Sequence, residues 1–422
     1  MTSPTPDFFS DPGVIADSRS YFELMRARGP VTPEAFQNTL MVTGFDAALE
    51  VLNDKTGVFS NACSVVGPIP GLPFAPEGSD IRDQLERHRG ELPWADHLVC
   101  MDGKRHQEHR MLLGGLLTYK RLKQNEDYLR GLADRLIDGF IGKARCEVMP
   151  EYAHATTTYA ISDLMGIPED DRAELLELIG APPSQIDGDA VHKIGPDPLI
   201  SMKPRFDEYL RDRLERPRGD LMSDLVHATF KDGLRPEFDA VSALARFLFG
   251  AGQDTTSRLI AMAVLILAED PVLQQRLRDE PRRISDFVEE VLRYDAPVKV
   301  AYRLALADTE VAGVAVTAGT ILTVCYNAAS NDSAHFEHPE RFDIDRPNLR
   351  DHMGFGRGFH GCLGAPLGRM EARIAIERLL ARANNIRISD EHHGPAENRH
   401  YRFEPTYTFR SLAELHIEFE PA

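Results

Sequence analysis

The sequence predicts a mainly α-helical fold with smaller β regions, an α+β arrangement. Apolar residues at helical spacing dominate as far as about Arg293, and short apolar segments bounded by turn residues follow. The chain has 422 residues, of which 42% are hydrophobic and 27% charged. This composition is typical of globular proteins, and a chain of this length can bury a large core.

The charge balance argues against polyanionic partners. The 66 acidic and 48 basic residues give a net charge of −18, which disfavours nonspecific binding to nucleic acid or to an anionic membrane. The N-terminus has neither the basic segment nor the apolar run of a targeting signal. We therefore expect a cytoplasmic protein that binds neither nucleic acid nor a membrane.

The five cysteines lie far apart and include no CxxC pair. Because their number is odd and they are dispersed, they indicate neither a disulfide framework nor a structural zinc site. They favour a reducing compartment, in agreement with a cytoplasmic location.

Two segments lack a clear hydrophobic period. Residues 61–102 are rich in Pro, Gly and charge, and residues 181–199 form a second loose stretch. Long loops in compact domains are usually functional, so both segments could cover a binding pocket. Their composition is equally typical of solvated surface loops, and both interpretations remain open.

One long helix is expected over about residues 237–269. Its centre contains Gly250, Gly252, Asp254 and Thr255, all poorer helix formers than Ala, and this interruption excludes a membrane span. The glycines would let a flat ligand lie against the helix, while Asp254 and Thr255 would relay protons. A kinked helix with a solvated polar patch explains the same residues equally well.

Later elements follow from shorter patterns. VAYRLAL (residues 300–306) and GTILTVCYNA (residues 319–328) are expected to form strands. The last long helix is expected after Cys362, because apolar residues recur at helical spacing from Leu363 and Pro366 lies in the first turn.

The segment GFGRGFHGCLG, residues 354–364, places five glycines around Cys362. Glycine lets backbone N–H groups approach another atom closely, so such a run typically shapes a site. At a helix N-terminus, the dipole and the free N–H groups should lower the pKa of the Cys362 thiol and favour a thiolate. That thiolate could be a nucleophile, a zinc ligand or an axial ligand of haem iron.

Each alternative makes a different demand on the sequence. A nucleophile needs a positioned base, and His360, two residues away, need not face the sulfur. Zinc needs three or four ligands, which do not gather around this segment. GRGFHG satisfies GxGxxG but follows no convincing strand, so it does not indicate a nucleotide site. The haem interpretation explains more of the segment.

These motifs together resemble the cytochrome P450 family. FGRGFHGCLG (residues 355–364) satisfies the family's FGxGxHxCxG haem-ligand loop, and AGQDTT (residues 251–256) satisfies its oxygen-activating helix motif. The resemblance extends from about residue 20 to the C-terminal RSLAELHIEF. Three weaker motifs agree in order and rough separation: HxxxR in HQEHR (106–110), ExxR in EVLR (290–293) and PERF (339–342).

The resemblance implies a fold in which haem b lies between the long central helix and the cysteine loop. It also implies one haem domain over residues 1–422, with no fused reductase. Cys362 would be the proximal iron ligand, with Phe355 shielding its sulfur. Further residues expected against the haem are Ala251, Gly252, Gly356 and Gly364, and those expected at its propionates are His106, Arg110, Arg303 and His360.

The resemblance also implies roles for two other groups of residues. Glu290, Arg293 and Arg341 would form a buried charged network with a structural role behind the haem-binding loop. Asp254 and Thr255 would deliver protons during O2 activation.

The implied activity is that of a monooxygenase that hydroxylates a small or medium hydrophobic organic substrate with O2 and two electrons. Because the sequence has no cysteine cluster of ferredoxin type, the electrons would come from a separate ferredoxin and its reductase. Arg357, Arg369 and Arg373 could dock an acidic carrier or form an ordinary solvated helix face. Two alternatives remain: a haem-thiolate protein that only binds or senses a ligand, and, more remotely, a cysteine-dependent hydrolase without haem.

By analogy with the family, mostly apolar and aromatic residues line the substrate pocket, which favours a terpenoid, aromatic or fatty compound. Lys299 is the exception: pointing inward it could pair with a substrate carboxylate, although lysines more often extend to water. The expected pocket residues are Phe247, Val298, Lys299, Val300, Thr406 and Tyr407, with the segments at 61–102 and near residue 190.

Overall fold

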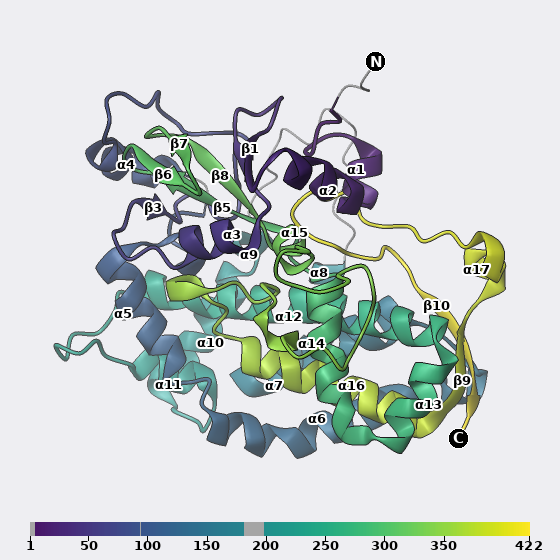
Figure 1. The fold of residues 1–422 in the computed structure, drawn as a ribbon. Helices are drawn as coiled ribbons and strands as arrows, with labels where there is room; N and C mark the ends of the chain where they lie inside the picture. The colour runs from purple at the N-terminus through teal and green to yellow at the C-terminus, as the bar shows by residue number, and fades with distance from the viewer. Residues whose placement is uncertain (1–4, 93, 181–197) are drawn as a thin grey trace.

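The computed structural model describes residues 5–92, 94–180 and 198–422 (Figure 1). The expected loose stretch at 181–199 lies outside these residues except for its last two. Helices dominate the described chain and the strands form three small sheets, so the expected α+β class is confirmed. None of the described helices has the length and apolar character needed to cross a membrane.

The described helices are α1 (Pro12–Ala16), α2 (Arg19–Arg28), α3 (Phe45–Leu52), α4 (Arg82–His88), α5 (Gly103–Gly114), α6 (Tyr119–Phe140), α7 (Ala155–Met165), α8 (Arg172–Gly180), α9 (Pro198–Ser201), α10 (Lys203–Glu215), α11 (Leu221–His227), α12 (Phe238–Glu269), α13 (Pro271–Asp279), α14 (Ile284–Tyr294), α15 (Tyr326–Ser330), α16 (Ala365–Arg382) and α17 (Asp390–His393). The strands are β1 (Val31–Pro33), β2 (Leu40–Val42), β3 (Phe59–Ser60), β4 (Arg145–Glu147), β5 (Val300–Ala305), β6 (Thr309–Val311), β7 (Val314–Val316), β8 (Ile321–Cys325), β9 (Ala383–Ile388) and β10 (His416–Pro421).

The largest sheet has the strand order β1-β2-β8-β5-β3. Strand β2 runs parallel to β8, and β5 pairs with β8 in the antiparallel direction, which places Arg303 opposite Leu322. Strands β5 and β8 confirm the two strands expected from the sequence. The second sheet, β4-β10-β9, contains the last strand of the chain, and β6 and β7 form a hairpin.

The expected central helix is confirmed as α12, which lies among the other helices in Figure 1. Its polar centre does not break the helix. Both apolar ends are buried, and the helix packs against α7, α10, α14 and α16. Because these neighbours lie both before and after it in the sequence, between residues 155 and 382, α12 is the axis on which the site is built.

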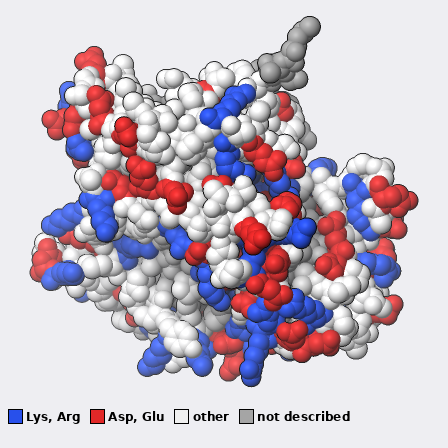
Figure 2. Space-filling view, in the orientation of Figure 1, with Lys and Arg blue, Asp and Glu red and all other residues white. Residues whose placement is uncertain are grey.

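Helix α16 begins directly after the cysteine loop, as expected, and runs parallel to α6. Four ion pairs join the two helices, and the numbers of both partners increase together along them: Glu126–Arg373, Arg130–Glu377, Asp134–Arg378 and Asp138–Arg382. In most of these pairs at least one side chain is about one-third exposed or more. Exposed ion pairs contribute little to the free energy of unfolding, so these four pairs determine the parallel direction of the two helices more than the stability of the fold. Basic and acidic side chains are interspersed over the face seen in Figure 2.

The segment at 61–102 is not simply a loop. It contains α4 and two short 3₁₀ turns, Arg89–Glu91 and Leu98–Cys100, so the expectation of a segment without regular structure is wrong in part. Leu85 of α4 is buried, and the Asp102 carboxylate accepts a hydrogen bond from the Asn61 backbone N–H at 2.8 Å. The two ends of the segment are therefore tied together.

Candidate active site

The glycines of the cysteine loop are required by close approaches. Gly356 and Gly358 have φ angles of 64° and 69°, a region that disfavours other residues. A Cβ atom on Gly358 would collide with the carbonyl oxygen of Leu52 at the end of α3. The loop closes through a hydrogen bond of 2.8 Å from the Cys362 N–H to the Phe355 carbonyl. Backbone geometry thus sets the position of the cysteine.

Cys362 is exposed, whereas the other four cysteines are buried. Surrounding protein atoms nevertheless raise the pKa of its thiol, and this outweighs the opposite effects of the Gly364 and Ala365 N–H groups and of Arg110 and Arg369. The helix N-terminus therefore acts in the expected direction, but burial outweighs it and the net effect on the pKa of Cys362 is upward, opposite to the expectation. A metal ion bound to the sulfur would itself remove the proton.

The four basic residues expected at the propionates lie together. The rings of His106 and His360 stack with centroids 3.8 Å apart. Burial, together with the positive charges of Arg110 and Arg303, lowers the pKa of His106 to about 4 and that of His360 to about 2. The cluster is therefore strongly electropositive.

The hydrogen bonds of this cluster leave room for an anion. Arg110 donates to the Gly361 carbonyl at 2.6 Å, and Arg303 donates to the Tyr302 carbonyl at 2.7 Å. Neither guanidinium group has a carboxylate partner among the described residues. An accessible thiol beside such a cluster fits haem, whose iron takes a thiolate and whose propionates carry two negative charges.

The cysteine loop lies against the polar centre of α12. A Cβ atom on Gly368 would stand 3.2 Å from Thr256 Oγ1 and 3.8 Å from the Phe355 ring. On α12, Ala251 is exposed although the helix ends are buried, and Thr255 Oγ1 donates to its carbonyl at 2.8 Å. The accessible turn of α12 at Ala251 therefore directly precedes Thr256, where the helix meets Gly368 and the Phe355 ring.

The glycines of α12 have a different role from the one expected. A Cβ atom on Gly250 would lie only 2.6 Å from Leu199 Cδ2, and one on Gly252 would lie 3.5 Å from Ile161 Cδ1. Both missing side chains thus face neighbouring helices rather than a ligand. The expectation that they make room for a flat ligand is wrong; Ala251 is the accessible residue.

The predicted charged network is correct for two of its three members. Glu290 and Arg293 are fully buried and form two hydrogen bonds of 2.8 Å. The third guanidinium belongs to Arg346, whose Nε lies 3.1 Å from Glu290 Oε1. The Arg341 side chain is 71% exposed, and only its backbone carbonyl takes part, accepting from Arg293 at 3.0 Å. The expectation for Arg341 is therefore wrong.

The expected substrate residues form two groups. Val298 bridges to Phe409, and the Lys299 N–H donates to the Thr408 carbonyl at 2.8 Å, so the start of β5 lies beside the loop carrying Thr406 and Tyr407. Val300 is fully buried within a cluster of apolar side chains. Phe247 lies on α12, with its ring 5.6 Å from that of His97 in the 61–102 segment.

Lys299 does not extend to water, so that expectation is wrong. Its side chain is buried, and Nζ donates to the carbonyl oxygens of Ile15 at 3.1 Å and Thr406 at 2.9 Å. Burial lowers the pKa of Lys299 to about 7, with a further contribution from Arg410 that exceeds the opposing effect of Asp295. The ammonium group therefore joins the two ends of the chain.

The free energy of unfolding should rise with pH because of Lys299. Between about pH 7 and the ordinary lysine pKa, the unfolded chain binds the proton more strongly than the folded one, so stability increases as pH rises through this window. We expect Lys299→Met to flatten this slope, and its stability relative to the wild type to be greatest at pH 7. Urea unfolding at several pH values measures this; the exposed Lys104→Met is the control, and an unchanged slope in Lys299→Met contradicts the assignment.

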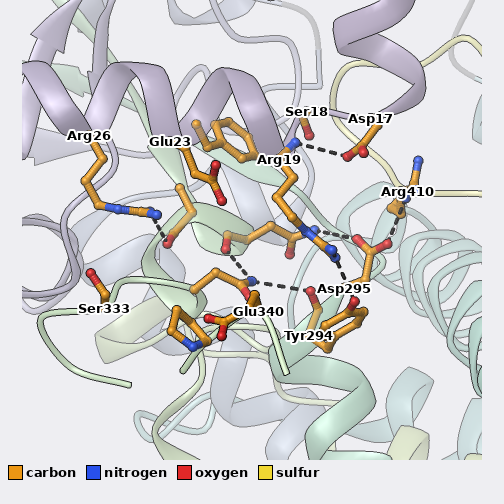
Figure 3. Close-up of a pocket in the computed structure, with 15 residues that line it drawn as sticks. Asp17, Ser18, Arg19, Glu23, Arg26, Tyr294, Asp295, Ser333, Glu340 and Arg410 are labelled. Carbon is orange, nitrogen blue, oxygen red and sulfur yellow. Dashed lines mark hydrogen bonds and ion pairs between the residues drawn. The ribbon is translucent and has the colours of Figure 1, made fainter. Parts of the chain in front are cut away.

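A surface cavity of about 290 Å³ lies elsewhere, between α2, the end of α14 and α15 (Figure 3). Arg410 donates to Asp295 across it at 2.9 Å, and the Arg19 guanidinium stacks 4.4 Å from the centre of the Tyr294 ring. None of the described residues that line it was expected to contact haem or substrate. This cavity is therefore not the candidate active site.

Two of the three arginines expected to dock a carrier already have carboxylate partners. Arg369 Nε lies 2.6 Å from Glu289, and Arg373 lies 2.8 Å from Glu126. Arg357 instead donates to the carbonyl of Arg350 at 2.9 Å. Their charges are therefore unequally available to a partner.

Comparisons with known proteins agree with this geometry. The family model described as Cytochrome P450 matches residues 200–385. The biotin biosynthesis cytochrome P450 of Bacillus subtilis (strain 168) is 30% identical over 407 residues, which cover 95% of this chain and 96% of that protein. The vitamin D(3) 25-hydroxylase of Pseudonocardia autotrophica is 33% identical over 303 residues, 70% of this chain and 73% of that protein. The substrate-free structure of Mycobacterium marinum cytochrome P450 CYP150A6 is 43% identical, covers 99% of each chain and gives a TM-score of 0.92.

Proposed function

Since the chain belongs to the cytochrome P450 family, it is a haem b monooxygenase, and we propose that it hydroxylates a small or medium hydrophobic organic molecule in the cytoplasm. The observation that carries this proposal is the exposed Cys362 at the start of α16, beside a basic cluster in which Arg110 and Arg303 donate to backbone carbonyls and, within the described part of the chain, pair with no carboxylate. When bound, haem supplies the O2-activating chemistry. The protein acts as one haem domain served by a separate electron carrier.

The chain's own residues hold and shield the cofactor. Cys362 would ligate the iron, and the aromatic ring of Phe355, under the Arg369 guanidinium at 4.4 Å, would limit solvent access to the sulfur. His106, Arg110, Arg303 and His360 would hydrogen-bond the propionates. Bound propionates would balance the positive potential that this cluster creates.

Asp254 and Thr255 would move protons on the accessible turn of α12. The Thr255 hydroxyl donates to the Ala251 carbonyl, which fixes the orientation of its oxygen. Asp254 lies next to it and is 31% exposed, so it can exchange protons with water. A hydroxyl held beside a carboxylate can pass a proton inward while the remaining apolar residues exclude bulk water.

Substrate class follows from the apolar residues at the start of β5 and the rings of Phe247 and Tyr407. Electrons would come from an acidic ferredoxin and its reductase, with no nucleic acid or membrane partner. Of the three candidate docking arginines, Arg357 would contribute most, because the charges of Arg369 and Arg373 are balanced by Glu289 and Glu126.

Thr255→Ala tests the proposed proton route. We expect product formed per NADH consumed to fall at least about tenfold, because the inward proton step loses its hydroxyl. The measurement uses a surrogate ferredoxin and reductase, with a hydrophobic compound first selected by the spectral change it causes on binding the holoenzyme. The exposed Thr317→Ala is the control. An unchanged ratio of product to NADH in Thr255→Ala would refute the proton route. If none of the compounds that bind the wild-type holoenzyme yields product, a ligand-binding role is favoured instead.

A further inference from the structure

A second carboxylate shares the arginine that holds Asp254. Arg258 lies one turn after Asp254 on α12, with Nε 3.1 Å from both carboxylate oxygens and Nη2 2.7 Å from Oδ1. Its remaining terminal nitrogen, Nη1, donates to Glu404 at 2.6 Å. The Arg258 side chain is only 11% exposed, so this three-residue bridge lies largely inside the protein.

The bridge ties α12 to the loop that also carries Thr406. Glu404 is held by hydrogen bonds of 2.9 Å from its N–H to the Ser411 carbonyl and 2.8 Å from the Thr406 N–H to its carbonyl. The Arg258 guanidinium also lies 5.1 Å from the centre of the Phe409 ring. Glu404 is therefore fixed by its own loop and presents its carboxylate to Arg258 independently of Asp254.

One guanidinium group divided between two carboxylates holds neither as firmly as it would hold one. Both oxygens of Asp254 accept hydrogen bonds from Arg258, which holds the carboxylate in one orientation. A second acceptor draws Arg258 away and lets the Asp254 carboxylate reorient more easily. His154, whose Nδ1 lies 3.1 Å from Gln253 Nε2, is a further titratable group near the bridge.

We propose that Arg258 and Glu404 are positioning residues for the proton route: Glu404 competes with Asp254 for Arg258 and thereby sets how readily Asp254 exchanges a proton. This inference rests on the proposed function of Asp254 and Thr255. Neither Arg258 nor Glu404 touches the reacting atoms. Glu404 acts only through Arg258, the arginine that it shares with Asp254.

The first test needs no turnover. Glu404→Gln, Asp254→Asn and the double variant are unfolded with urea as holoenzymes. We expect each single variant to shift the midpoint modestly, because Arg258 keeps one carboxylate, and the double variant to shift it by clearly more than the sum, because a buried guanidinium is then left unpaired. Additive shifts would overturn the shared-arginine geometry.

The second test reads the proton step. Glu404→Gln leaves Arg258 to Asp254 alone, so we expect product per NADH to fall about threefold or more and the solvent deuterium isotope effect on turnover to increase. Glu404→Asp should restore much of both, because it keeps the charge. Glu414→Gln, which removes the partner of Arg402 in the same region, is the matched control.

The outcomes separate the two proposals. Suppose that Glu404→Gln keeps the wild-type ratio of product to NADH and the wild-type isotope effect, while Asp254→Asn forms less product per NADH. This result would overturn the role of Glu404 and leave the proposed function intact. Unchanged coupling in Asp254→Asn and Thr255→Ala would overturn the proton route itself, and the inference with it.

Discussion

Cys362→Ser is expected to abolish the red-shifted band that reduced, thiolate-ligated haem gives with carbon monoxide, and to lower turnover at least about a thousandfold. Such a loss corresponds to about 4 kcal/mol in the activation barrier. The serine hydroxyl occupies nearly the same volume, so the loop closed by the Cys362 N–H and the Phe355 carbonyl should remain folded. What disappears is the soft, electron-donating ligand, and with it the effect of the axial ligand on O–O cleavage.

The matched control is Cys146→Ser. Cys146 is 3% exposed and lies in strand β4, so its replacement tests the general effect of introducing a hydroxyl at a buried cysteine. We expect the carbon monoxide band of this variant to keep its position. Absorption spectra of the two reduced variants, with the haem content of each measured separately, make the comparison. A red-shifted band that persists in Cys362→Ser would remove the basis for the assigned ligand.

Arg346→Ala should cost on the order of 3 to 5 kcal/mol in the free energy of unfolding, whereas Arg341→Ala should change it by less than about 0.5 kcal/mol. The Arg346 side chain is 5% exposed and bonds Glu290, which has no exposed surface. Removing the Arg346 side chain leaves the buried carboxylate of Glu290 with one guanidinium partner, Arg293, in place of two. Arg341→Ala keeps the backbone carbonyl that accepts from Arg293, and it removes only an exposed side chain.

Urea unfolding and haem content of the purified holoenzymes distinguish the two arginines. We expect Arg346→Ala to lose haem as well as stability, because the network lies behind the cysteine loop: a Cβ atom on Gly354 would stand 2.9 Å from the Leu292 carbonyl, next to Arg293. If both variants lost the same amount of stability and haem, the exposed Arg341 would contribute more than its contacts indicate, and the assignment of Arg346 as the third member of the network would be contradicted.

The sequence was most informative where a feature is local. The glycines around Cys362 and the poor helix formers in α12 each break an ordinary preference over a few residues, and Pro366 is a local signal for the start of α16. Such violations mark functional positions because a stable fold would otherwise avoid them. The central helix, the two strands and the position of the cysteine were therefore predictable without tertiary information.

The misassigned residues depend on contacts that the sequence does not specify. PERFDIDR contains two arginines five residues apart, and only the folded structure shows that Arg346 reaches Glu290 whereas Arg341 stays exposed. The direction of Lys299 is set by a carbonyl of Ile15, 284 residues away. Glu404, which was not singled out, reaches Arg258 across 146 residues. Only the spacing of Arg258 four residues after Asp254 offered a local signal.

The meeting of the two chain ends over β5 has a consequence for biosynthesis. Lys299 and Arg410 hold the carbonyls of Ile15 and Ala16, and Arg410 also binds Asp295. The segment around Ile15 and Ala16 thus receives anchoring contacts from residues that lie 284 and 394 positions later in the chain. During synthesis this segment can reach its final position only after those residues have emerged, so the packing of α1 against the rest of the fold is expected to be a late step.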